Sequence, residues 1–245
     1  MKMLRRSLRI PIPLWRVGAV LCDRKTVIAA AMALSACCAM PQHGDVAKNF
    51  NGAELLALLQ TLNADLLSHD SATLTLERWC ADHGLAQPPR IVARRVRDAT
   101  KDIPDDLRER LKVGAAEALA YRHVQLACGE HVLSEADNWY VPGRLTSEMN
   151  RTLEATDEPF GKVVKPLDFR RRTVSAELLW SPLPKGWEMS SASRLNPSEA
   201  MEIPHDVLRH EAVLYTSTQL PFSAVVETYT SEIFAFGPTA PRSNR

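Results

Sequence analysis

Leucines at helical spacing open the part of the chain that we expect to fold. They occupy positions 55, 56, 58, 59, 62, 66 and 67, so an apolar side chain recurs every three or four residues. The preceding segment, Asn51-Gly52-Ala53-Glu54, has the form of a capping box, in which Asn51 and Glu54 each accept the other's backbone N–H. The pattern predicts one helix starting here and a second over about 71–83, ended by Gly84.

Alternating apolar and polar positions predict strands over much of the remaining chain. The expected strands cover 89–98, 120–127, 132–141, 168–180, 210–218 and 222–236. Between them we expect a helix at 146–155, a short one near 159–165, and a helical or irregular stretch over 105–118. Residues 181–209 contain four prolines and are expected to form a long surface loop. Helices at the front and strands that can pair as antiparallel neighbours predict an α+β fold, with helices packed on an antiparallel sheet.

The N-terminal 40 residues have the pattern of an export signal. Arg24 and Lys25 precede the uncharged run 26–36, which is too short to span a bilayer and fits the apolar region of a signal peptide. The run ends in Leu34-Ser35-Ala36-Cys37, which resembles a lipobox and predicts lipidation of Cys37 and an exported, envelope location. The alternative is a chance Ala-rich segment or buried helix, in a cytoplasmic protein.

The expected domain organisation follows from these patterns. Residues 1–40 form the leader, 41–50 a tether, 51–236 the folded domain and 237–245 a tail. With 45% hydrophobic residues, a domain of this length can bury a sizeable core, and we expect a monomer.

Composition and motifs exclude several classes of function. Seven of the 30 Lys and Arg residues and one of the 29 Asp and Glu residues lie in 1–36, which leaves 37–245 with a net charge of −5. An acidic domain argues against nonspecific nucleic-acid binding. The sequence lacks GxGxxG, P-loop, GxSxG, HExxH and CxxC motifs, so neither a metal nor an organic cofactor is expected. Cys80 and Cys128 could pair in an oxidising compartment, but two buried thiols are the expectation.

Two charged residues fall on apolar strand faces. Arg122 shares its face with Ala120, Val124 and Leu126, and Glu227 shares its face with Val225, Tyr229 and Ile233. A buried unpaired charge costs several kcal/mol, so each requires a partner or a ligand. Two alternatives stay open: Arg122 and Glu227 pair with each other or the backbone, or they bind a small anionic ligand. The arginines in the expected strand 89–98 likewise either bind an anion or form a solvent-exposed strand face.

Four segments in order resemble the chorismate lyase family. The hairpin Tyr121–Glu130 with Val141-Pro142 resembles its central hairpin, and Glu158-Pro159-Phe160-Gly161-Lys162 resembles its Pro-Leu-Gly turn. Leu220-Pro221-Phe222 leading to Val226-Glu227-Thr228 is similar to its last strand, and Leu66–Thr73 to its Asp-Ser-Met-Thr segment. The resemblance covers about 55–236 and identifies the chain as a divergent member.

The resemblance implies cofactor-free cleavage of chorismate to 4-hydroxybenzoate and pyruvate, an early step of ubiquinone biosynthesis. It implies that Arg122 binds a ligand carboxylate and that Glu227 contacts the oxygen at the other end of the ring, where a carboxyl with a raised pKa would protonate the leaving group. Phe160, Gly161 and Ala72 would contribute to the pocket. Two departures alter its shape: Ala72 stands where the family has methionine, and Phe160 where it has leucine.

Three functions are compatible with these observations. The first is an enzyme of the chorismate lyase kind, acting on chorismate or a related small aromatic carboxylate. The second is a non-catalytic envelope lipoprotein that binds a small carboxylate, since the same fold serves as the effector domain of bacterial transcription regulators. The third is a structural envelope protein with a vestigial pocket.

Overall fold

The computed structural model describes residues 50–97, 99–189 and 201–236. The predicted leader, tether and tail, with Cys37, lie outside the described residues, apart from Phe50. The helices are α1 Gly52–Ser68, α2 Ala72–His83, α3 Leu107–Arg110, α4 Ser147–Ala155 and α5 Phe160–Val163. The strands are β1 Ile91–Arg95, β2 Ala120–Cys128, β3 His131–Tyr140, β4 Arg170–Leu178, β5 Asp206–Tyr215 and β6 Pro221–Thr230. None of the helices in these ranges is long and apolar enough to cross a membrane.

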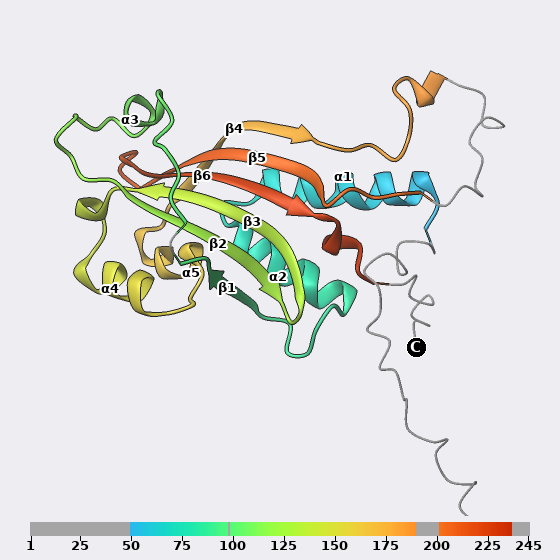
Figure 1. Cartoon of the computed structure of the whole chain (residues 1–245), viewed down its shortest axis with the longest axis horizontal. Coiled ribbons are helices and arrows are strands. Elements are labelled where there is room, and N and C mark those ends of the chain that lie inside the picture. The colour runs from blue at the N-terminus through green and yellow to red at the C-terminus, as the bar shows by residue number, and fades with distance from the viewer. Residues whose placement is uncertain (1–49, 98, 190–200, 237–245) are drawn as a thin grey trace, which may run out of the picture. The chain divides into compact units, whose positions relative to one another are not determined.

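The strands form one six-stranded sheet in the order β1-β2-β3-β6-β5-β4, and every neighbouring pair is antiparallel. This arrangement confirms the predicted α+β class. Figure 1 shows β1 and β4 at the two edges and the β2–β3 hairpin curving through the middle. The placement of β6 between β3 and β5 brings the last strand next to the central hairpin, so residues about 90 positions apart become neighbours.

The two long helices, α1 and α2, have the capping residues that the sequence predicts. Asn51 accepts a hydrogen bond from the Glu54 N–H, and the Glu54 carboxylate accepts one from the Asn51 N–H, so the capping box is present. Ser71 caps α2, and Gly84 ends it in the left-handed conformation, which glycine adopts at little cost. Leu55, Leu59, Leu62 and Leu66 form the buried stripe of α1.

Helices cover one face of the sheet, which we call the helix-side face. Buried residues of α1 and α2 pack there against β2, β3, β5 and β6, and α4 and α5 extend the cover towards Tyr140, Leu214 and Phe222. The opposite face is covered in part by the segment around α3, where Leu107 and Leu111 pack on Trp139, Val213 and Ala224. The helix-side face is therefore the inner surface of the main core.

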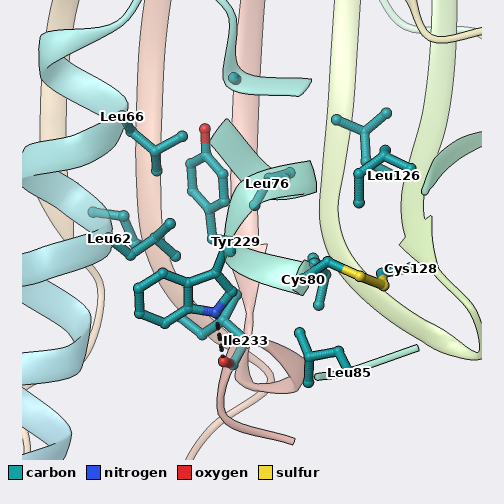
Figure 2. Close-up of a cluster of buried hydrophobic side chains, with 14 of the residues drawn as sticks. Leu62, Leu66, Leu76, Cys80, Leu85, Leu126, Cys128, Tyr229 and Ile233 are labelled. Atoms are coloured by element: carbon teal, nitrogen blue, oxygen red, sulfur yellow. Dashed lines mark hydrogen bonds between the residues drawn. A yellow bond between two sulfur atoms is a disulfide. The ribbon is translucent and has the colours of Figure 1, made fainter. Parts of the chain in front are cut away.

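A disulfide joins α2 to β2, which corrects the expectation of two buried thiols. Cys80 and Cys128 are 48 residues apart, but the packing of α2 on β2 brings their Cα atoms to 6.4 Å, a separation typical of disulfides. Figure 2 shows the bond among Leu76, Leu85 and Leu126. The neighbouring residue Trp79 donates a hydrogen bond from its indole to the carbonyl of Ile233. The sequence could not show this proximity because it depends on helix–sheet packing.

The last two strands differ from their predicted limits. The predicted strand over 222–236 ends at Thr230, and residues 231–234 form a 3-10 turn capped by the Thr230 side chain. The predicted strand at 210–218 starts earlier, at Asp206, because its pairing with β6 continues to Thr230. The predicted 181–209 loop is correspondingly shorter, and residues 190–200 within it lie outside the described ranges.

Candidate functional site

Arg122 and Glu227 both lie on the helix-side face, as strand alternation predicts. In β2 the buried positions alternate through Arg122, Val124 and Leu126, and in β6 Glu227 lies between Val225 and Tyr229. Arg122 is 2% exposed and Glu227 is 6% exposed. Arg122 is level with Asn138 of β3, which is level with Val225 of β6. Strand β3 therefore lies between the two charged residues, and along the strand direction Glu227 is offset from Arg122 by two residues.

Glu227 is paired with an arginine that the sequence analysis missed. A guanidinium nitrogen of Arg171, from β4, lies 2.6 Å from a carboxylate oxygen of Glu227, and both side chains are less than a tenth exposed. The same oxygen accepts a hydrogen bond from the Tyr229 hydroxyl at 3.2 Å. Burial alone would lower the pKa of Arg171, but Glu227, with Tyr229 and Asp70, outweighs it and raises that pKa above its ordinary value. The alternative of an Arg122–Glu227 pair is not what the structure contains.

The turn between α1 and α2 holds the strand that carries Arg171. The Arg171 backbone N–H donates to the Asp70 carboxylate at 2.7 Å, and the Arg170 side chain lies 3.3 Å from the other Asp70 oxygen. The next residue, Ser71, caps α2. The segment that the resemblance identified from its Asp-Ser sequence thus fixes both the start of α2 and the edge strand.

His210 is a second residue that the sequence analysis did not assign to the site. It lies on β5 level with Glu227, is fully buried, and its Nε2 lies 2.8 Å from the side-chain oxygen of Asn63 on α1. Burial and, to a smaller extent, the Arg171 charge lower the pKa of His210, and Glu227 offsets part of this effect, so that the pKa falls to about 4. The ring is therefore neutral at pH 7.

A cavity of about 40 Å³ lies between α2, α5 and the helix-side face. It is lined by three of the predicted ligand residues, Ala72, Phe160 and Gly161, and by Glu227 with its partner Arg171. Gly161 approaches α2 closely, because a Cβ on it would lie 3.1 Å from the Ser71 hydroxyl oxygen. Any larger residue at 161 would narrow this junction.

Arg122 adjoins this cavity without lining it. Its strand neighbour Val124 and its cross-strand partner Asn138 line the cavity, whereas Arg122 borders a second hollow beside β1. All three guanidinium nitrogens of Arg122 are buried and lack a hydrogen-bond partner. Burial lowers the pKa of Arg122, the Arg95 charge adds to this effect, and Tyr140 and Asp157 oppose it. A guanidinium stays protonated in proteins, so the core contains a cation with no bonded counter-charge.

Four of the five predicted site residues thus surround one cavity, and the fifth lies next to it. Asn138 and Arg171 also line this cavity, and His210 lies on β5 level with Glu227. The sequence did not reveal the pairing of β4 with β5 and of β5 with β6, which brings Arg171 and His210 to this region. Arg171 stands within the run Arg170-Arg171-Arg172, where only strand alternation could have singled it out. In the described ranges no group of three or more His, Cys, Asp or Glu side chains could hold a metal ion.

The arrangement offers two chemically different ends on one apolar surface. One end has a carboxylate already balanced by a cation and a phenol, and such a group can accept a hydrogen bond from a ligand hydroxyl. The other end has an unbalanced guanidinium, whose planar fork suits a carboxylate. A flat ligand with an anionic group at one end and a hydroxyl at the other matches this polarity.

Comparison with solved structures returns ligand-binding domains of bacterial regulators at low similarity. The effector domain of PhnF from Mycobacterium smegmatis has a TM-score of 0.42 and 12% identity, over 66% of this chain and 90% of that one. The ligand-binding domain of a putative GntR-family transcriptional regulator from Bordetella bronchiseptica has a TM-score of 0.38 and 16% identity, over 58% and 83%. At TM-scores below 0.5 these likenesses support no argument about this chain.

Sequence comparison gives a much closer relative. No protein-family model matches the chain. The chain is 53% identical over 184 residues to the uncharacterized protein y4mC of Sinorhizobium fredii, and the match covers 75% of this chain and 78% of that protein. Identity at this level over most of both lengths means that the chain belongs to the same family as the Sinorhizobium fredii protein y4mC.

Proposed function

We propose that this protein binds a small aromatic carboxylate, of the chorismate or 4-hydroxybenzoate kind, on the helix-side face. In this proposal Arg122 takes the carboxylate, and Glu227 accepts a hydrogen bond from an oxygen at the far end of the ring. Ala72, Phe160 and Gly161 form the walls around the ring.

The observation that carries the proposal is the unpaired guanidinium of Arg122. It is 2% exposed and none of its three nitrogens has a hydrogen-bond partner. A buried unpaired charge destabilises the fold by several kcal/mol, whereas a bound carboxylate would supply two charge-assisted hydrogen bonds. A ligand therefore explains why a cation occupies this position, and a purely structural role does not.

Ligand entry requires the cavity to enlarge. Its volume of about 40 Å³ has room for a few water molecules, whereas an apolar cavity of about 150 Å³ is known to hold benzene. The extra volume must come from residues that separate the cavity from Arg122. Phe160 is the best placed, because it lines the cavity, packs 5.4 Å from the Tyr140 ring, and starts the short helix α5.

Cleavage of chorismate is the second candidate, and the position of the two charges on one face of the sheet favours it. The chorismate lyase resemblance implies that Arg122 is the carboxylate binder and Glu227 the acid. The Glu227 carboxylate already pairs with Arg171 at 2.6 Å and accepts a hydrogen bond from the Tyr229 hydroxyl, an arrangement that suits hydrogen-bond acceptance better than proton donation. Binding is therefore the function that the geometry supports best.

Both functions are tested with the purified full chain. Calorimetric titration with 4-hydroxybenzoate should give binding that Arg122→Met abolishes and Glu227→Gln weakens. Incubation with chorismate, followed for pyruvate and 4-hydroxybenzoate together, separates the candidates. Stoichiometric release would establish the lyase, whereas binding without release would establish the binding protein. Absence of both from folded protein would contradict the proposal and leave the structural envelope protein.

The cellular location is a separate proposal, which depends on the lipobox-like segment ending at Cys37. If Cys37 is lipidated, the protein is anchored to the membrane and its ligand is met in the envelope. Fractionation of cells that express the native protein or Cys37→Ser tests this. The native form should be in the membrane fraction and the variant in the soluble one; two soluble forms would contradict lipidation.

A further inference from the structure

A second hollow, of about 210 Å³, lies where β1 ends beside β2. The described residues that line it are Arg95, Val96, Arg97, Ala99, Tyr121, Arg122 and His123. None of these residues lines the cavity beside Glu227. We call this hollow the arginine hollow.

The arginine hollow combines three arginines and, among the described residues that line it, no carboxylate. Asp137 contacts Tyr121 and His123 of this lining, but its carboxylate is already engaged by these two side chains and by Lys101. Asp157 raises the pKa of Arg122 through its charge, without a hydrogen bond to the guanidinium. The described residues that line the hollow therefore carry an excess of positive charge.

Strand pairing directs the three arginines to a common region. Arg95 is level with Val124, so it lies on the helix-side face, one alternate position from Arg122. The Val96 N–H donates to the His123 carbonyl at 3.0 Å, which holds the chain after β1 against β2. Arg97 follows on the exposed rim.

The arginines of the hollow are weakly engaged by the described part of the protein. The side chain of Arg95 makes one long hydrogen bond, 3.4 Å, to the backbone carbonyl of Glu154. Arg97 has no hydrogen bond or ion pair in this part of the chain, and the Arg122 guanidinium has no partner. The guanidinium groups of Arg95 and Arg97 can thus contact a ligand in the hollow, and Arg122, which also lines it, adds a third positive charge.

We propose that the arginine hollow binds a phosphate group. Guanidinium forks match phosphate oxygens bidentately, and a dianion balances the excess charge better than a monoanion. The site goes beyond the proposed carboxylate function, since it shares the charge of Arg122 but needs neither Glu227 nor the smaller cavity. The phosphate is either free or part of a small organic ester.

The test is calorimetric titration of the full chain with inorganic phosphate at constant ionic strength. Arg97→Gln and Arg95→Gln should each weaken binding by about tenfold or more, because each removes a charge-assisted hydrogen bond to the phosphate. Arg94→Gln is the matched control, because Arg94 stands on the same strand, points to the opposite face and is exposed. It should change the affinity less than about twofold, as expected of a screened surface charge.

Two further titrations define the ligand. Acetate should bind at least about tenfold more weakly than phosphate, because its single charge leaves part of the excess unbalanced. If phenyl phosphate binds more tightly than inorganic phosphate, the ligand is an organic ester. If the two affinities are equal, the ligand is free phosphate. Either result supports the site. Equal losses in Arg97→Gln and Arg94→Gln, or acetate as tight as phosphate, would overturn it.

Glu227→Gln separates this inference from the proposed function. The variant should keep phosphate binding and weaken 4-hydroxybenzoate binding, whereas Arg97→Gln should do the reverse. If the full chain binds 4-hydroxybenzoate but not phosphate, only the phosphate site is overturned. If the full chain binds phosphate but not 4-hydroxybenzoate, only the proposed function is overturned.

Discussion

Arg171 and Arg122 are both buried on the helix-side face of one sheet, yet their surroundings differ. Arg171 has the Glu227 carboxylate at 2.6 Å, and the Asp70 side chain holds its backbone. Arg122 has no hydrogen-bond partner at any guanidinium nitrogen. The first arginine completes an internal ion pair and the second does not. Burial of a charge alone therefore says little about function, and the presence or absence of its partner says much more.

Removing the paired arginine should have the largest effect on stability. Arg171→Met leaves the Glu227 carboxylate buried without its cation, which should lower the free energy of unfolding by about 3 to 5 kcal/mol. Urea denaturation measures the change. The double variant Arg171→Met with Glu227→Leu should recover much of the loss, because both charges are then gone.

Arg170→Met is the matched control for that prediction. Arg170 is adjacent, and its side chain is 59% exposed in a 3.3 Å ion pair with Asp70, so its loss should cost less than about 1 kcal/mol. Equal effects of Arg170→Met and Arg171→Met would contradict the assignment of the buried pair.

Acidification should weaken the Arg171 region through His210. The pKa of His210 is lowered to about 4, whereas a histidine in the unfolded chain has an ordinary pKa near 6.5. Between these values the unfolded state binds the extra proton and the folded state does not, so stability falls as the pH decreases from about 6.5 to 4. The loss at the acid end should be about 2 to 3 kcal/mol.

His210→Gln isolates this contribution, since other groups also titrate in the same range. The wild type and the variant are unfolded in urea at several pH values between 7 and 4. The variant should show a shallower decline with falling pH. If the free energy of unfolding falls with pH equally in the wild type and the variant, His210 is protonated in the folded state as readily as in the unfolded one.

A methyl group at Gly161 should have the smallest effect on stability and a larger effect on binding. Its Cβ would lie 3.1 Å from the Ser71 hydroxyl and 3.3 Å from that of Thr73, so Gly161→Ala should cost about 1 kcal/mol. Because Gly161 lines the cavity, affinity for 4-hydroxybenzoate should fall further than stability. Gly143→Ala, where a Cβ meets no atom within 4 Å, should leave both nearly unchanged.

Local signals in the sequence were sufficient for the elements and for the face of each charge. The capping box at Asn51, the end of α2 at Gly84 and the alternation around Arg122 all depend on neighbours within a few residues. The partners depend on topology. Insertion of β6 between β3 and β5 and the pairing of β4 at the edge place Arg171 beside Glu227, and no local pattern encodes that contact. The disulfide between Cys80 and Cys128 escaped prediction for the same reason.

The free energy of unfolding of Arg122→Met, with and without 4-hydroxybenzoate, tests most directly the claim that Arg122 is retained for a ligand. Without ligand, the variant should be as stable as the wild type or more stable by about 1 to 2 kcal/mol, because an unbalanced buried charge is removed. Ligand at 100 times its Kd should stabilise the wild type by about 2.7 kcal/mol and the variant not at all. A ligand-free variant less stable by about 2 kcal/mol or more would show that Arg122 is a structural residue and contradict the account.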